Sequence, residues 1–429
     1  MSRVDQVGNH IDSISLTHKF DSDRLIFLNT SDVLEGEILS QKLFRIEELK
    51  GQAKKTIKNE DILFSEIRPK NKRYAFVDVI NPNDYVVSTK LMVLRNKSSE
   101  LLTKYIYYFL TYEGTLNYLQ MRAENRIGSF PQITFDHVKA LEIPLQDKNT
   151  QEGIVRLISM VDKKISLNNA LVSNITLQGQ YLYTYWFKNF EFLDDLGKRY
   201  RSNGGQFEWS NKLGREIPKG WKVVPLSDLI KESKGGDWGE DISVGNYDFE
   251  VSCVRGTDIE GLNGLGECSP PARFINKRNS FKTLDPNNLI IEISGGSPTQ
   301  STGRLGYVTE GLLKRFNKKI ICSNFCRALE LQNPKMVYNF ALEWGELYRR
   351  NIFFNFEGKT SGIKNLLFES FISSYYIELP DEKVVDKFYE VLQRLDEKKQ
   401  IALRENEHLR DLRNWLLPKL MTGAIKMGE

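Results

Sequence analysis

The chain has 429 residues, enough for two or three domains that each bury a core. Its 60 Lys and Arg residues against 56 Asp and Glu residues leave a net charge of only +4, which excludes a polybasic tail. Any nucleic-acid-binding surface must therefore be local. A content of 11% aromatic and 27% charged residues excludes an extensively disordered chain.

The N-terminal residues and the cysteines predict a cytoplasmic protein. The opening segment, MSRVDQVGNHIDSI, has no apolar stretch typical of a signal peptide, and four cysteines are too few for a disulfide framework. Residues 165–187 carry no formal charge over a length that could span a bilayer. They include five Asn and Gln side chains, which a lipid-facing helix would have to desolvate. We therefore expect a soluble helix here and no membrane span.

The first globular domain is expected over residues 1–146. Short β-branched and aromatic runs separated by turns, such as the runs within 57–79 and 85–94, predict strands, and residues 101–122 predict a helix between them. This mixture predicts a mixed α/β domain.

A long helix is predicted over residues 147–190, after Pro144, and a second one over 382–429, after Pro380. In both, apolar residues recur at alternating steps of four and three, an average of 3.5 residues per turn that is typical of coiled coils. The apolar seam positions are Ile154, Ile158, Val161, Ile165, Val172, Ile175 and Leu182 in the first helix, and Phe388, Leu392, Leu395, Leu409, Leu416 and Leu420 in the second. Between the helices we expect a linker at 191–216, rich in Gly, Asn and Ser, and a second α/β domain at 217–381.

The two halves of the chain resemble each other. Residues 57–79 match 284–308, 85–94 match 319–331, and 133–147 match 369–382. The apolar seam positions of the two helices are separated by a similar number of residues. The alternative is two unrelated amphipathic helices, each packed on its own domain. The shared pattern favours an internal repeat with a pseudo-two-fold relation, whose two helices pair with each other as an antiparallel coiled coil.

Catalytic and metal-binding motifs are absent from the sequence. It has no phosphate-binding loop, dinucleotide fingerprint or nucleophile elbow. The segment NPND (81–84) lacks the second proline and the aromatic residue of an amino-methyltransferase motif. The four histidines have no neighbours at ligand spacing, and Cys322 and Cys326 are interpreted as core thiols on one strand. We expect no catalytic residue and no metal site.

Two pairs of loops are better suited to binding. The first pair is a basic loop around residues 66–73 and its counterpart at 297–304, which carries Ser, Thr and Gln side chains. The second pair, 122–134 and 355–365, combines Gly with Arg or Lys, so that backbone and cation can both approach a phosphate. Each loop alone could be a solvated turn. Their equivalent positions in the two copies favour a binding role.

Three segments resemble the DNA-specificity subunits of type I restriction–modification systems: REIPKGWKVVPLSDLI (215–230), LRDLRNWLLPKLMTGAIK (409–426) and YTYWFKNFEF (183–192). The resemblance covers nearly the whole chain, although the first domain lacks the Gly-Trp pair (Gly220 and Trp221) found at the start of the second domain. It implies two target-recognition domains that each recognise half of an interrupted double-stranded DNA sequence, with helices as the spacer. It also implies docking of two methyltransferase subunits, and in some systems restriction–translocase subunits. S-adenosylmethionine, and ATP with Mg²⁺, would be used by those partners and not by this chain.

The resulting DNA-binding candidates combine the loops with this resemblance. They are Arg68, Lys70, Lys72, Arg73, Arg122 and Arg126 in the first domain, and Arg255, Thr299, Gln300, Arg304, Lys359 and Lys364 in the second. Two other classes of protein stay open. One is a coiled-coil scaffold that binds proteins and is unrelated to restriction, and the other is a free-standing nuclease or methyltransferase.

Overall fold

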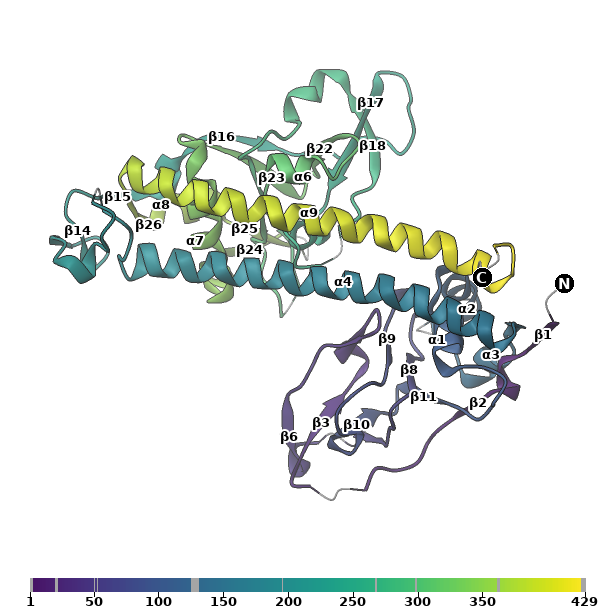
Figure 1. The fold of residues 1–429 in the computed structure, drawn as a ribbon. Helices are drawn as coiled ribbons and strands as arrows, with labels where there is room; N and C mark the ends of the chain where they lie inside the picture. The colour runs from purple at the N-terminus through teal and green to yellow at the C-terminus, as the bar shows by residue number, and fades with distance from the viewer. Residues whose placement is uncertain are drawn as a thin grey trace. The chain divides into compact units, whose positions relative to one another are not determined.

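A computed structural model describes residues 3–19, 22–49, 51, 53–124, 131–194, 196–266, 268–297, 299–360 and 363–425. The chain divides into two compact units, Met1–Ile165 with His408–Glu429, and Ser166–Glu407. Two long helices, α4 (Lys148–Tyr183) and α9 (Glu382–Met421), each run without interruption (Figure 1). Each therefore contributes one part to each unit.

The first unit contains a four-stranded antiparallel sheet of order β2-β11-β8-β9 and a second sheet of order β6-β3-β10-β7 in which β3 and β10 are parallel. A two-stranded ribbon, β1-β12, and a small hairpin, β4-β5, complete it. The strands are β1 (Arg3–Gln6), β2 (Ile11–Ser13), β3 (Arg24–Leu28), β4 (Val33–Leu34), β5 (Glu37–Ile38), β6 (Leu43–Arg45), β7 (Ala53–Lys55), β8 (Ile62–Ser65), β9 (Tyr74–Phe76), β10 (Tyr85–Ser88), β11 (Leu91–Asn96) and β12 (Glu142–Leu145).

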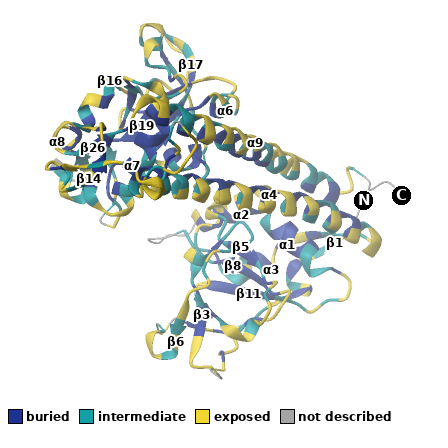
Figure 2. Cartoon of the chain, turned by 60° about the vertical axis from the view of Figure 1, so that its left-hand side comes forward, coloured by how far each residue is buried: buried dark blue, intermediate teal, exposed yellow. Residues whose placement is uncertain are grey.

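Strands β8 and β11 are buried along most of their length, which explains their continuous apolar runs (Figure 2). The helix expected over 101–122 is two helices, α1 (Thr103–Thr111) and α2 (Glu113–Glu124), because Tyr112 adopts an extended conformation between them. A short helix, α3 (Phe135–Lys139), precedes β12. The core of this unit joins side chains of α1 and α2 to Ile154 and Ile158 of α4 and to Leu417 and Leu420 of α9.

The second unit contains three larger sheets, of order β16-β23-β19-β21, β18-β17-β22 and β20-β25-β24, and the ribbons β13-β14 and β15-β26. Its strands are β13 (Phe207–Ser210), β14 (Arg215–Pro218), β15 (Lys222–Pro225), β16 (Ile230–Gly235), β17 (Tyr247–Val254), β18 (Ala272–Asn276), β19 (Leu289–Glu292), β20 (Ser294–Gly295), β21 (Leu305–Tyr307), β22 (Lys319–Cys322), β23 (Cys326–Leu331), β24 (Glu357–Thr360), β25 (Ile363–Leu366) and β26 (Tyr376–Leu379). Its shorter helices are α5 (Ile259–Leu262), α6 (Glu310–Leu313), α7 (Val337–Arg349) and α8 (Phe368–Ser374).

The two units share one strand topology, which confirms the internal repeat. The ribbon β1-β12 corresponds to β15-β26, and the sheet β2-β11-β8-β9 corresponds to β16-β23-β19-β21 in the same order. The parallel pair β3 and β10, with β6 at the edge, corresponds to β17 and β22 with β18 at the edge. Each unit then continues through a short helix and a last strand into a long helix. The fold class is therefore the predicted one, mixed α/β with two sheet-rich parts and two long helices.

The long helices pair antiparallel in both units. In the first unit, Arg413 Nη1 donates to Asp162 Oδ1 at 2.9 Å. In the second, Asn168 Nδ2 donates to Asn406 Oδ1 at 3.0 Å, and a Cβ added to Gly179 would lie 3.1 Å from Leu392 Cδ1. Residue numbers therefore rise along α4 as they fall along α9. Of the seam positions, the structure buries Ile154, Ile158, Val161, Ile165, Val172, Ile175, Phe388, Leu392 and Leu420 and half-buries Leu182, Leu395, Leu409 and Leu416.

Polar residues interrupt this seam, and each has a partner. Asn168 is 4% exposed and Asn406 is 1% exposed, and Asn406 Nδ2 also donates to Asn169 Oδ1 at 2.9 Å. Lys399 donates to the hydroxyl of Tyr307 at 2.5 Å and lies 3.0 Å from Asp396. Buried amide pairs of this kind favour one register over shifted ones, because a shift would leave each amide without a partner.

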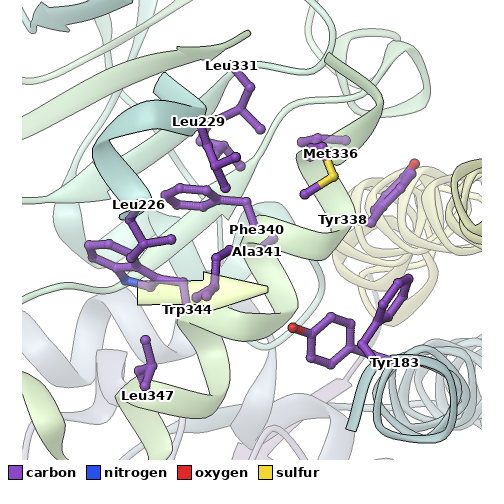
Figure 3. Close-up of a cluster of buried hydrophobic side chains, with 14 of the residues drawn as sticks. Tyr183, Leu226, Leu229, Leu331, Met336, Tyr338, Phe340, Ala341, Trp344 and Leu347 are labelled. Carbon is purple, nitrogen blue, oxygen red and sulfur yellow. The ribbon is translucent and has the colours of Figure 1, made fainter. Parts of the chain in front are cut away.

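The core of the second unit is aromatic. Phe340 and Trp344 of α7 point into a cluster with Leu226 and Leu229, and Tyr183 extends from α4 toward α7 (Figure 3). The Tyr183 hydroxyl donates to Glu343 Oε2 at 2.6 Å, and Lys188 Nζ donates to the same oxygen at 2.5 Å. Burial alone would raise the pKa of Glu343, but Lys188 and the tyrosine hydroxyls outweigh it, so this pKa lies below its usual 4.5.

Replacement of Glu343 by Gln is expected to lower the thermal unfolding midpoint at pH 7 and to make it less dependent on pH. Because the folded-state pKa is depressed, the carboxylate stabilises the fold above about pH 4.5, and this stabilisation is lost as the pH falls through the folded-state pKa. Melting curves of wild type and Glu343→Gln between pH 7 and pH 3.5 measure the difference, which should shrink below about pH 4.5. A difference of constant size over this range would contradict the assignment.

Residues 191–216, expected to be a linker, contain ordered structure. A 3-10 turn (Arg201–Asn203) leads into the hairpin β13-β14. Phe190 and Phe192 are buried against Trp221, with ring centroids 5.8 and 5.1 Å from the indole. Trp221, the tryptophan of the Gly-Trp pair, thus anchors this segment to the second unit.

The interpretation of Cys322 and Cys326 as residues of one strand is wrong. Cys322 ends β22 and Cys326 begins β23, because the chain turns at Ser323–Phe325. Both thiols are buried, and burial raises the pKa of Cys326 to about 12. Among the described residues, no cluster of three or more His, Cys, Asp or Glu side chains is placed to hold a metal ion. No helix within the same residues is long and apolar enough to cross a membrane.

Candidate nucleic-acid interface

The two candidate loops of the first unit lie side by side. The β8–β9 loop meets the segment that follows α2 through a bridge between Ile67 and Gln132, and the Arg68 amide donates to the Pro131 carbonyl at 3.1 Å. Arg68 and Lys72 adopt left-handed backbone conformations, with φ of 44° and 53°, on either side of a 3-10 turn. This tight loop holds its basic side chains at the ends of β8 and β9.

The predicted basic residues of this unit differ in their availability. Arg68 and Lys70 are exposed. Lys72 lies 2.5 Å from Glu35, whose pKa is lowered by this lysine although burial alone would raise it. Arg73 Nη1 donates to the carbonyls of Ser31 and Val33.

Arg122 is exposed on α2, with its guanidinium 5.7 Å from the ring centroid of Tyr118. Arg126 lies outside the described residues. Within the described part of the chain, Arg68, Lys70 and Arg122 form no ion pair, so these exposed cations can meet a polyanion without first breaking one.

The equivalent loops of the second unit also meet. Strand β20, in the β19–β21 connection, pairs with β25 through Ser294 with Asn365 and Gly295 with Lys364. Arg304 holds the place of Arg73: the Glu292 amide donates to the Arg304 carbonyl, and the Ser65 amide donates to the Arg73 carbonyl, both at 2.9 Å. The two copies therefore bring the same two loops together but furnish them with different side chains.

These loops border an open cleft of about 1420 Å³ in the second unit. Arg255, Gln300, Arg304 and Lys364, four of the predicted residues, line it. Thr299 is exposed beside it on the same loop, and Lys359 lies on β24, but its side chain lies outside the described part of the chain. The structure thus gathers residues from three separate segments at one site.

The cations of the cleft are paired with carboxylates. Arg304 lies 2.6 Å from Glu292, Lys364 lies 2.9 Å from Glu357, and Arg255 lies 2.8 Å from Asp258. The hydrogen bond to Glu292 raises the pKa of Arg304. The cleft is therefore not a simple cationic surface, unlike the exposed residues Arg68 and Lys70 of the first unit.

Sequence reasoning missed several residues of the cleft. Glu292 is a carboxylate at the end of an apolar strand, an anomaly that could have identified it. Phe325 and Trp238, which are 49% and 37% exposed, also line the cleft. The sequence around them carried no signal, because loops that are distant along the chain bring them to the site.

Comparison with known proteins finds similar specificity subunits. Residues 22–177 match the model of the type I restriction modification DNA specificity domain. The chain is 28% identical to the type I restriction enzyme HindI specificity subunit of Haemophilus influenzae, over 96% of this chain and 97% of that protein. It is 24% identical to the MjaIX specificity subunit of Methanocaldococcus jannaschii, over 77% of this chain and 70% of that one.

The fold agrees with this comparison. The crystal structure of a type I restriction–modification system S subunit from M. genitalium superimposes with a TM-score of 0.51, at 15% identity, over 100% of this chain and 97% of that one. Residues 22–177 thus match a DNA specificity domain, and the chain is similar along nearly its whole length to a specificity subunit of a type I restriction enzyme.

Proposed function

We propose that the chain is the specificity subunit of a type I restriction–modification system and recognises an interrupted DNA sequence, with one half contacted by each unit and the long helices setting the spacing. One observation carries the proposal: two units of the same topology bring equivalent loop pairs together but equip them differently, with exposed cations in one and a polar cleft in the other. A shared frame with different loops is what two different half-sites require.

In this account the chain acts in the cytoplasm and selects the sequence, while other subunits modify the DNA. Two methyltransferase subunits, which use S-adenosylmethionine, would dock on the chain, and a restriction subunit that uses ATP and Mg²⁺ would join them. The exposed apolar residues Leu167, Leu171 and Tyr181 on α4 support docking of a protein partner. The chain itself would carry no catalytic residue.

Mapping of methylated bases across the host genome tests the proposal. Deletion of the gene should remove methylation from one interrupted motif, and an intact copy supplied on a plasmid should restore it. Unchanged methylation, in a host where the methyltransferase subunits are expressed, would contradict the proposal. The chain would then be better explained as a scaffold unrelated to restriction.

Replacement of Arg68 and Lys70 by Ala is expected to weaken DNA binding to a similar extent for all sequences. These side chains are exposed, so we expect them to contact phosphates, and loss of one such contact reduces the slope of log K against log salt by about 1. Binding of the full chain with its partner subunits to a cognate and an unrelated duplex, measured at several salt concentrations, gives both quantities. The matched control is Lys58→Ala. Lys58 is exposed and precedes β8, so it lies at the opposite end of that strand from the loop. An unchanged salt slope would exclude phosphate contacts by this loop.

A further inference from the structure

The cleft of the second unit has a floor built around a buried ion pair. Glu292 is 2% exposed, and its Oε1 and Oε2 accept hydrogen bonds from Nη2 and Nε of Arg304 at 2.6 and 3.0 Å. A Cβ added to Gly256 would lie 2.6 Å from Glu292 Oε1, and one added to Gly295 would lie 2.7 Å from it. The backbone on both sides is therefore glycine where the carboxylate needs space.

Arg255 stands next to this floor, since it precedes Gly256. Its Nε donates to Asp258 Oδ2 at 2.8 Å and its Nη2 donates to Asp258 Oδ1 at 3.0 Å. Asp258 also accepts from the backbone amides of Arg255, at 2.9 Å, and of Ser269, at 3.2 Å, and its side chain is only 4% exposed. The carboxylate is fixed by the backbone and in turn fixes the orientation of the guanidinium.

The other edge of this guanidinium faces outward. The side chain of Arg255 is 42% exposed, against 12% for Arg304. Its Nη2 also donates to the Ser269 carbonyl at 3.1 Å, and among the described residues no acceptor bonds to its Nη1. The two hydrogens of Nη1 are thus the donors left for a ligand, held in a fixed orientation, and the N7 and O6 acceptors at the major-groove edge of guanine are groups to which they can donate. The adjacent carboxylate cancels the charge of the arginine, so an uncharged acceptor such as a base edge is favoured over a phosphate.

The neighbouring side chains of the cleft are also of types that contact base edges. Gln300 supplies an amide, which pairs with adenine in the same groove, and Asn324 is exposed beside it. Phe325 is 49% exposed and offers an apolar surface to a thymine methyl group. This combination differs from the exposed Arg68 and Lys70 of the first unit, which suit phosphates.

We propose that this cleft is the base-recognition site of the second unit, that Arg255 contacts a guanine of its half-site, and that Asp258 is a positioning residue that orients Arg255. The inference rests on the proposed function, and it adds the base and the residue that recognises it. Glu292 and Arg304 form the rigid floor against which the backbone beside Arg255 packs.

Relative binding to a set of duplexes, each with one position of the second half-site changed, tests this inference. The full chain with its partner subunits is compared with Arg255→Lys, which keeps the charge but loses the planar guanidinium and the fixed orientation of its Nη1 donors. At one guanine position, the preference for guanine over the other bases should fall by about 10-fold or more, while all other positions, including the first half-site, keep their preferences. Asp258→Asn should cause a smaller loss at the same position.

Arg315→Lys is the matched control. Arg315 also binds a carboxylate, that of Glu407, through Nε and Nη2, and its side chain is 3% exposed, but it lies outside the cleft lining. It should leave every base preference unchanged. Circular dichroism establishes that each variant is folded.

Two results would overturn the inference. In the first, the folded Arg255→Lys variant has the same base preferences as the wild type at every position of the half-site. In the second, it binds all sequences more weakly by the same factor, as loss of a phosphate contact would cause. Failure of the proposed function would look different, because the wild-type complex would then prefer no sequence in either half.

Discussion

Removal of one matched heptad from each long helix is expected to shorten the spacer of the recognised DNA sequence and to leave both half-sites unchanged. The segments are Val161–Leu167 of α4 and His408–Asn414 of α9. Their removal eliminates the Asp162–Arg413 pair as a whole and keeps the Asn168–Asn406 pair. The seam steps across each junction become three residues, so the apolar register continues.

The size of this effect follows from helix geometry. Seven residues at 1.5 Å each shorten the helix pair by about 10 Å, which is about three base pairs of DNA. Selection of bound duplexes from a library with random half-sites and variable spacers measures both properties at once. Deletion of the α4 segment alone is the control, because it mismatches the facing residues and should lower stability. An unchanged spacer, or an altered half-site, would contradict the role of the helices as a spacer.

Replacement of Phe388 by Ala is expected to destabilise the second unit by about 3–5 kcal/mol. Phe388 is fully buried near the start of α9, with ring centroids 4.8 Å from Phe187 and 5.6 Å from Trp186, both in the π-helical turn that follows α4. Removal of the ring leaves a cavity and deletes the contacts that join the two helices in the aromatic core.

Urea unfolding of the full chain measures this loss. Val391→Ala, three residues further along α9 and 40% exposed, is the control and should change the unfolding free energy by no more than about 0.5 kcal/mol. A loss below about 1 kcal/mol for Phe388→Ala would show that the aromatic cluster can collapse around the missing ring.

The helices and the repeat could be predicted from the sequence because their signals are periodic and long. The seam from Ile154 to Leu182 extends over many turns, so single polar interruptions such as Asn168 do not hide it. The matches around Pro144 and Pro380 coincide with β12 and β26, the equivalent last strands of the two units. Local errors arose where a short turn separates two apolar strands, as between Cys322 and Cys326.

The residues of the candidate site could be predicted from the sequence only in part, and their pairing with one another mostly could not. The loops that meet in each unit are far apart in the sequence, and strand pairing brings them together. The pairing of Arg304 with Glu292 depends on the register of β19 against β21, which a single sequence does not specify. The pairing of Arg255 with Asp258, three residues away, is local and could have been recognised from the segment RGTD.

Selection of bound duplexes from a fully random library, with the chain assembled with the subunits that co-purify with it, tests the central claim most directly. We expect one motif in two parts, separated by unspecified bases of constant number. Arg255→Lys should alter only one of these parts. A continuous motif, or no enriched sequence at all, would contradict the claim that each unit recognises its own half of an interrupted sequence.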